Sequence, residues 1–164
     1  MIHLTTERLI LRDWKASDLD AWAAINADPG VRRYLGDRTP ADRRDSWHMM
    51  AAAAGNQMLS GFGMWAAEEK ASGTLVGRIG LYEPPHFPDL EVNWLLGRDW
   101  WGRGLAREGA EACIAHAFGE LNRKTISAFI AAGNERSISL ARWLGMSDIG
   151  EAWPGVRQFQ RRAM

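Results

Sequence analysis

The segment Glu91–Phe118 constrains the fold of this chain most strongly, because two different hydrophobic periods meet in it. Residues Glu91–Leu96 alternate as a β-strand does, whereas apolar side chains further along recur at the spacing of an amphipathic helix. Between these patterns lies the turn Trp101–Ala106, which contains Gly102 and Gly104. The segment therefore predicts a strand, a tight basic turn and a helix in succession.

The turn is suited to a phosphate group. Glycines let the backbone approach a ligand closely, and the start of a helix leaves several N–H groups without partners. These donors and the positive end of the helix dipole favour a phosphate or pyrophosphate, and Arg98, Arg103 and Arg107 add positive charge nearby. A plain strand-to-helix connection with solvated arginines explains the same spacing, so the spacing alone leaves both interpretations open.

Two common phosphate-binding motifs do not fit the turn. A Walker loop needs Gly-Lys-Ser/Thr, and Arg107 occupies the place of the third small residue of a dinucleotide fingerprint. The segment instead resembles the acetyl-CoA pyrophosphate loop of the GNAT acetyltransferases, written Gln/Arg-x-x-Gly-x-Gly/Ala. Gly104 and Ala106 match that pattern, and Trp101 stands at its Gln/Arg position. A Trp-Gly-x-Gly version resembles the RimJ/RimL branch, which acetylates protein N-termini and various small amines.

Two further segments carry the same resemblance. Residues 6–35 closely resemble the N-terminal opening of RimJ/RimL-like proteins, whose helix and following loop form one wall of the acceptor cleft. Asn134 and Ser137, followed by a helical pattern that ends at Gly145, resemble the second GNAT signature, Asn-x-x-Ser/Ala. Met146 replaces the aromatic residue that usually follows this glycine. Asn134 is also expected to cap its helix.

The patterns along the chain predict the element order β-α-α-β-β-β-α-β-α-β-β within one domain, residues 1–164. By resemblance, that order is the GNAT fold, an α/β (α+β) fold with a mixed, mostly antiparallel central sheet and helices on both faces. The expected strands span residues 7–14, 64–68, 74–82, 91–96 and 124–131, with two more in 148–164. The expected helices span residues 17–28, 39–54, 106–118 and 134–144.

Some local expectations are specific enough to be checked. Ser17 and Thr39 are expected to cap the first and second helices, and residues 55–63 are expected to form a loop. Gly77 and Gly80 lie inside a strand pattern, which indicates a bulge or the close approach of another backbone.

Composition excludes several classes of protein. With 20 basic and 20 acidic residues, the formal net charge is zero, which argues against non-specific binding to nucleic acid or an anionic membrane. The chain has one cysteine, Cys113, so neither an intrachain disulfide nor a cysteine-rich metal site is possible, and no metal is expected. Cys113 falls on the apolar side of its helix and is expected to be a core residue. No run suits a membrane span and no signal pattern is present, so the expected location is cytoplasmic.

The resemblance implies acetyl-CoA as co-substrate and direct attack of a primary amine on its thioester. The turn donors would hold the pyrophosphate, and the edge of the preceding strand would pair with the pantetheine arm, with a backbone N–H polarising the thioester carbonyl. The expected cofactor-binding residues are Leu95, Leu96, Trp101, Gly102, Arg103, Gly104, Leu105, Ala106, Arg107 and Asn134.

Glu91 is the first candidate for the catalytic base. It shares one face of its strand with Asn93, and a buried acid needs a partner or a function. We expect it to accept the proton of the amine through water; a structural ion pair or hydrogen bond with a neighbouring strand is the alternative. His86, in a proline-rich loop, is a second candidate base, although lone loop histidines are usually only solvated.

Ser137 is the candidate group for the leaving thiolate. Many GNAT enzymes use a tyrosine seven residues after the motif asparagine, but this chain has Ala141 there. RimL-like enzymes place a serine at the position that matches Ser137. The alternative is that its hydroxyl only bonds the local backbone.

These residues favour an acetyl-CoA-dependent N-acetyltransferase whose acceptor is a protein N-terminus or a small amine. A catalytically silent CoA-binding regulatory module is the first alternative, and a nucleotide-phosphate protein is the second. The chain is expected to be a monomer or a homodimer, with Trp22, Trp47 and Trp100 as candidate exposed residues of a dimer surface.

Overall fold

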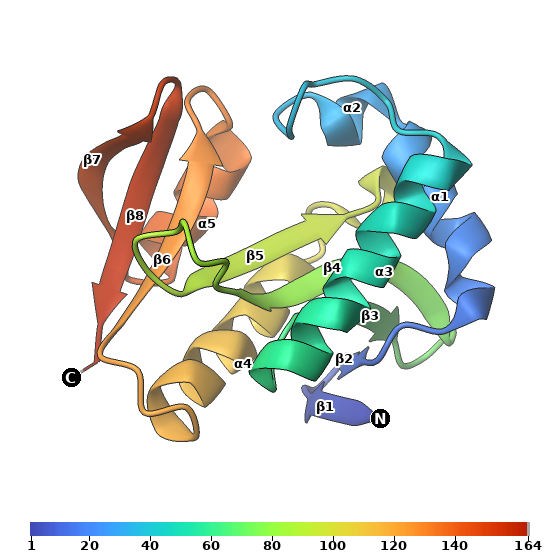
Figure 1. Ribbon diagram of the computed structural model, residues 1–164, viewed down its shortest axis with the longest axis horizontal. Coiled ribbons are helices and arrows are strands. Elements are labelled where there is room, and N and C mark those ends of the chain that lie inside the picture. The colour runs from blue at the N-terminus through green and yellow to red at the C-terminus, as the bar shows by residue number, and fades with distance from the viewer. Residues whose placement is uncertain (164) are drawn as a thin grey trace.

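The computed structural model describes residues 1–163; Met164, the last residue of the segment expected to hold the two final strands, lies outside them. One sheet has the strand order β1-β2-β3-β4-β5-β6-β8-β7 (Figure 1). Every neighbouring pair is antiparallel except β5 with β6. The strands are β1 Ile2–Thr5, β2 Leu9–Arg12, β3 Met64–Glu69, β4 Thr74–Tyr82, β5 Glu91–Leu96, β6 Thr125–Ala131, β7 Ser147–Trp153 and β8 Val156–Arg162. The helices are α1 Leu19–Ala27, α2 Pro29–Arg32, α3 Arg43–Ser60, α4 Leu105–Gly119 and α5 Glu135–Trp143.

Helices cover both faces of the sheet, as the sequence predicted. Figure 1 shows α1 and α3 on one side and α4 on the other. The larger core lies between the sheet and α4 with α5, and it includes Val92 and Leu96 of β5. The smaller core lies against α1–α3 and includes Leu95 and Trp22. Because successive side chains of a strand point to opposite faces, the odd-numbered residues of β5 face α1 and the even-numbered residues face α4.

Strand β1 is an element that the sequence patterns missed. It is short and lies at the edge of the sheet, and its outer residues are exposed. Its order comes from pairing with β2 and from Asp13, which accepts hydrogen bonds from the N-terminal amine and from His3. The alternation in this segment, Ile-His-Leu-Thr, covers only four residues, so these contacts with residues outside it decide that it is a strand.

The first expected helix differs in its start and end. The segment opens as a short 3-10 helix, Ala16–Asp18, and Asp18 accepts a hydrogen bond from the Lys15 N–H at 2.8 Å, so the expectation that Ser17 is the cap was wrong. Asp28 follows the end of α1, and its side chain caps α2 by accepting from the Gly30 N–H at 2.7 Å.

The second expected helix is longer than predicted and begins later. Asp42, not Thr39, caps α3 by accepting from the Asp45 N–H at 2.8 Å. The helix continues through Gly55 and ends at Gly61, whose φ is 77°. Residues 55–60 are therefore helical rather than a loop, although a glycine in a helix interior costs about 1 kcal/mol relative to alanine.

The two glycines of β4 allow close backbone approach, as expected. A Cβ atom at Gly77 would collide with the carbonyl oxygen of Leu95, and one at Gly80 would collide with the carbonyl oxygen of Gly63. The β3–β4 register also shifts between Ala67 and Glu68, which places a bulge beside Gly77. These contacts fix β4 tightly against both of its neighbours.

The tryptophans divide between core and surface. Trp22 is only 1% exposed, so it cannot belong to a dimer surface, whereas Trp47 is 49% exposed. Trp100 is half-buried and packs against the larger core. Cys113 is fully buried, and burial raises its thiol pKa, which confirms the prediction of a core residue.

Candidate functional site

Strands β5 and β6 are paired at their beginning and then separate. Within the described residues a single bridge joins them, between Glu91 and Ser127, where the Ser127 N–H donates to the Leu90 carbonyl at 2.8 Å. Figure 1 shows the two strands diverging beyond this point. Within residues 1–163, the rest of this edge of β5 therefore has no neighbouring strand.

The direction of the backbone groups along β5 follows from its hydrogen bonds. The Leu90 carbonyl faces β6, whereas the Gly97 N–H donates to Val76 on the β4 side at 2.9 Å. Since backbone groups alternate along a strand, Trp94 and Leu96 present theirs at the open edge and Leu95 presents its own to β4. The Trp101 indole donates to the Leu96 carbonyl at 2.8 Å, which fixes the end of that edge. Leu95 and Leu96 were both predicted to line this edge. Leu96 presents its backbone groups there, whereas those of Leu95 face β4.

The turn after β5 leaves a run of main-chain donors without partners. Gly102 and Gly104 have φ angles of 73° and 77°, in the left-handed region that glycine tolerates best. The first hydrogen bond of α4 runs from the Glu108 N–H to the Gly104 carbonyl at 3.1 Å. Within the described chain, the N–H groups of residues 102–107 therefore have no acceptor. Such an arrangement at a helix start binds anions.

Arg8 and Glu108 hold this turn against the N-terminal strands. The Glu108 carboxylate accepts from the Thr6 hydroxyl at 2.5 Å and from Arg8 Nε at 2.7 Å, while Arg8 Nη1 donates to the Arg103 carbonyl at 2.8 Å. Burial alone would raise the pKa of Glu108, but the bonds from Thr6 and Arg8 lower it below its ordinary value. Sequence reasoning missed this anchor, since its partners lie about 100 residues apart.

Arginines surround the turn, but not all of those expected. Arg98 forms an ion pair with Asp28, its Nε lying 2.9 Å from Oδ2, so its charge is compensated within the chain. Arg136, at the start of α5, was not expected near the turn. Three arginines lie over tryptophan rings: Arg103 over Trp100 at 4.8 Å, Arg107 over Trp143 at 3.1 Å and Arg136 over Trp101 at 4.6 Å. These stacked side chains supply positive charge around the unpartnered donors.

Ser137 joins α5 to the open edge of β5. Asn134 caps α5, its side chain accepting from the Ser137 N–H at 3.4 Å, as the sequence predicted. The Ser137 hydroxyl accepts from the indole of Trp94 at 3.3 Å. Because the indole is only a donor, the hydroxyl hydrogen stays available to donate to another group. Ala141, which stands where the resemblance would place a tyrosine, is fully buried.

Glu91 is buried on the side of the sheet that faces α1. Its side chain is 5% exposed and accepts from Asn93 Nδ2 at 3.0 Å. Burial raises the pKa of Glu91 to about 7, against the opposing effects of the Asn93 bond and the charge of Arg78. Among the described residues, Glu91 has no ion-pair partner, and its hydrogen bond is to its own strand. This carboxyl is therefore poised to change protonation near neutral pH.

His86 is less well placed than Glu91. It is exposed on the loop between β4 and β5 and contacts Phe87 edge-on, with ring centroids 5.0 Å apart. No contact in residues 1–163 ties it to Glu91 or to the open edge of β5.

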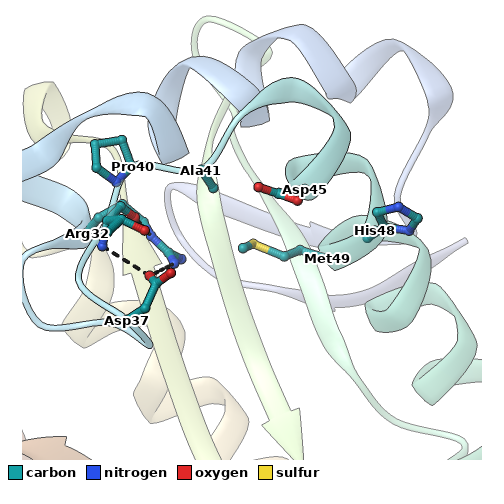
Figure 2. A pocket seen from close by; sticks show the side chains of 8 residues that line it. Arg32, Asp37, Pro40, Ala41, Asp45, His48 and Met49 are labelled. Carbon is teal, nitrogen blue, oxygen red and sulfur yellow. Dashed lines mark hydrogen bonds and ion pairs between the residues drawn. The ribbon is translucent and has the colours of Figure 1, made fainter.

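A surface depression of about 520 Å³ lies between α3 and the loop that precedes it. Figure 2 shows Arg32 and Asp37 pointing toward each other at one end of it, with His48 at the other. None of the residues predicted for the site lines this depression. Residues 1–163 contain no group of three His, Cys, Asp or Glu side chains that could hold a metal, and no helix there is long and apolar enough to span a membrane.

Comparison with known proteins decides the family. A family model described as an acetyltransferase (GNAT) domain matches residues 8–147. The chain belongs to the GNAT family. It is an acyltransferase enzyme, and the GNAT fold uses acetyl-CoA or CoA as co-substrate.

Relatives and solved structures agree with this assignment. The uncharacterized protein YkkB of Bacillus subtilis is 29% identical over 150 residues, covering 87% of this chain and 84% of YkkB. An uncharacterized N-acetyltransferase, p20 of Bacillus licheniformis, is 26% identical over 151 residues, covering 92% and 85%. An acetyltransferase of Agrobacterium tumefaciens has a TM-score of 0.85 at 28% identity, with 98% and 94% coverage.

A RimL acetyltransferase of ribosomal protein L7/L12, solved in complex with coenzyme A, has a TM-score of 0.82. It is 14% identical to this chain, and the alignment covers 99% of this chain and 98% of RimL. At that identity the likeness shows the fold alone. The comparisons therefore assign the chain to the GNAT family but not to a particular branch of it.

Proposed function

We propose that this GNAT enzyme transfers the acetyl group of acetyl-CoA to a primary amine, on a protein N-terminus or a small molecule, by direct attack on the thioester. The observation that carries the proposal is the run of unpartnered N–H groups at residues 102–107, which lies next to the unpaired edge of β5. The first feature suits a diphosphate and the second suits the amide-bearing arm that follows it.

The cofactor would lie across the turn and along β5. The main-chain donors from Gly102 to Arg107 would bind the pyrophosphate, and the side chains of Arg103 and Arg107 would add positive charge. The free N–H groups of Trp94 and Leu96 would meet the pantetheine arm, and one of them would polarise the thioester carbonyl. Leu95 would contribute through its side chain, since its backbone faces β4. Trp101 and Asn134 would hold the two sides of the site in place.

Glu91 would then take the proton of the attacking amine through water. With a pKa of about 7, it is substantially ionised at neutral pH and is still basic enough to accept a proton. As the C–N bond forms and the C–S bond breaks, the proton leaves the amine for Glu91. The Ser137 hydroxyl would donate to the departing sulfur, in an orientation fixed by the Trp94 indole.

A direct assay tests the proposal. The protein is incubated with acetyl-CoA and a panel of small amines and N-terminal peptides, and the released thiol is measured. We expect release with one class of acceptor. Binding of coenzyme A without release with any acceptor would instead support the silent CoA-binding module, for which the absence of the usual tyrosine is the one supporting observation.

The RimJ/RimL branch, the cytoplasmic location and the choice between monomer and homodimer stay predictions. Analytical ultracentrifugation would decide the last of these. Of the proposed surface tryptophans, Trp47 remains the exposed candidate for a dimer contact.

A further inference from the structure

Arg78 is a cationic residue in the middle of the sheet that lacks a partner. It lies on β4 between Ala66 of β3 and Leu95 of β5, on the side that faces α1. Its side chain is partly exposed, but its Nε atom is buried without a hydrogen-bond partner, and its guanidinium forms no hydrogen bond or ion pair within residues 1–163. Its Cζ atom lies 5.8 Å from the ring centroid of Trp22.

The two buried arginines of the described residues, Arg12 and Arg32, both have partners. Arg12 bonds Asp18 at 2.8 and 2.9 Å and Glu68 at 2.7 Å. Arg32 donates to the Thr39 carbonyl at 2.9 Å and pairs with Asp37, as Figure 2 shows. A guanidinium nitrogen removed from water normally has such a partner, because leaving a buried donor unpaired is costly. Arg78 therefore lacks the kind of partner that Arg12 and Arg32 have, and an anionic ligand would supply one.

Other polar groups share the same face of the sheet. Asn93 pairs across from Gly80, which makes it a diagonal neighbour of Arg78, and its Oδ1 atom is also buried without a partner. Glu91 lies one step further along the same face of β5, opposite Tyr82. The face thus presents a carboxyl that is suited to accept a proton, an unpartnered amide oxygen and an unpartnered guanidinium in a row.

We infer that the acceptor amine also carries a carboxylate, as a free amino acid does. This inference rests on the proposed function and names its substrate class. The amine would lie at Glu91, with Asn93 Oδ1 accepting one of its hydrogens, and the carboxylate would lie at the Arg78 guanidinium, whose planar donors fit it. A polyamine has no carboxylate to pair with Arg78 and would bring its own positive charges next to this guanidinium.

Matched acceptors test the inference. Each amino acid of a panel is compared with its own amide and with the amine left by removal of the carboxylate, for example phenylalanine, phenylalaninamide and phenethylamine. We expect the wild-type kcat/KM to be at least about tenfold higher for the amino acid than for either analogue. We expect the ratio of kcat/KM for the amino acid to kcat/KM for its analogue to fall close to one in Arg78→Gln. The same ratio should stay at the wild-type value in Arg44→Gln, which alters an exposed arginine.

Two further measurements keep the outcomes separate. Coenzyme A affinity that matches the wild type shows that Arg78→Gln has folded, and Arg78→Lys, which retains the charge, should keep part of the preference. If the amide and the amino acid react equally well, the inference is overturned while acetyl transfer stands. If no amine reacts, the proposed function fails, and calorimetric titration of the same amino acids into the CoA-bound protein decides the carboxylate site. Binding that Arg78→Gln abolishes supports the site, and no binding overturns it.

Discussion

Replacement of Glu91 by glutamine tests the burial of this carboxyl through protein stability. Burial raises the pKa of Glu91 from an ordinary 4.5 to about 7. At about 1.4 kcal/mol for each pH unit, that difference corresponds to about 3 kcal/mol. Because the folded state holds the proton more tightly than the unfolded state, the free energy of unfolding falls as the pH rises from 4.5 to about 7, and it levels off above 7.

Glutamine resembles the protonated acid and does not titrate. Below pH 4.5 we therefore expect Glu91→Gln and the wild type to be about equally stable. At pH 8 the variant should be more stable by about 3 kcal/mol, which for a chain of this size corresponds to a rise in Tm of roughly 6–12 °C. Other groups titrate equally in both proteins and cancel in the difference.

Urea unfolding at pH 4.5 and pH 8, followed by circular dichroism, measures this difference. Glu7→Gln is the matched control, because Glu7 is exposed. The difference in the free energy of unfolding between this variant and the wild type should be the same at both pH values. A difference between Glu91→Gln and the wild type that is the same at both pH values would refute the reasoning. It would mean that the carboxylate is solvated or paired in solution and that burial does not set its pKa.

Three other expectations concern activity and the turn. Glu91→Gln should lower kcat by roughly 100-fold or more, the usual contribution of a general base, and leave coenzyme A affinity unchanged; a near-normal rate in the thiol-release assay would remove Glu91 from the mechanism. Ser137→Ala should lower kcat by less than about 100-fold, since a thiolate leaves without full protonation, and an unchanged rate would mean that Ser137 only packs. Glu108→Ala should weaken coenzyme A binding and cost about 1–3 kcal/mol of stability, because Arg8 and Thr6 lose their acceptor; calorimetry and urea unfolding check this, and affinity equal to that of a Glu7→Ala control would show that the anchor does not organise the turn.

The sequence by itself determined the elements whose causes are local. The alternation in Glu91–Leu96 predicted β5, and the apolar period after it predicted α4. Gly102 and Gly104 predicted a turn because glycine tolerates left-handed φ angles, which both residues adopt. Asn134 predicted a helix start because its side chain can accept from the backbone N–H three residues further along. Each of these signals depends on residues within one or two turns of one another, so the order along the chain contains them.

The tertiary structure alone decided which distant residues meet and which remain without partners. Glu108 meets Arg8, and Ser137 meets Trp94, across separations of 100 and 43 residues. The divergence of β5 from β6 and the unpartnered guanidinium of Arg78 likewise depend on how strands pair and helices cover them. No local pattern encodes such contacts, because the hydrophobic and hydrogen-bonding energies that select them belong to the assembled sheet and its helices.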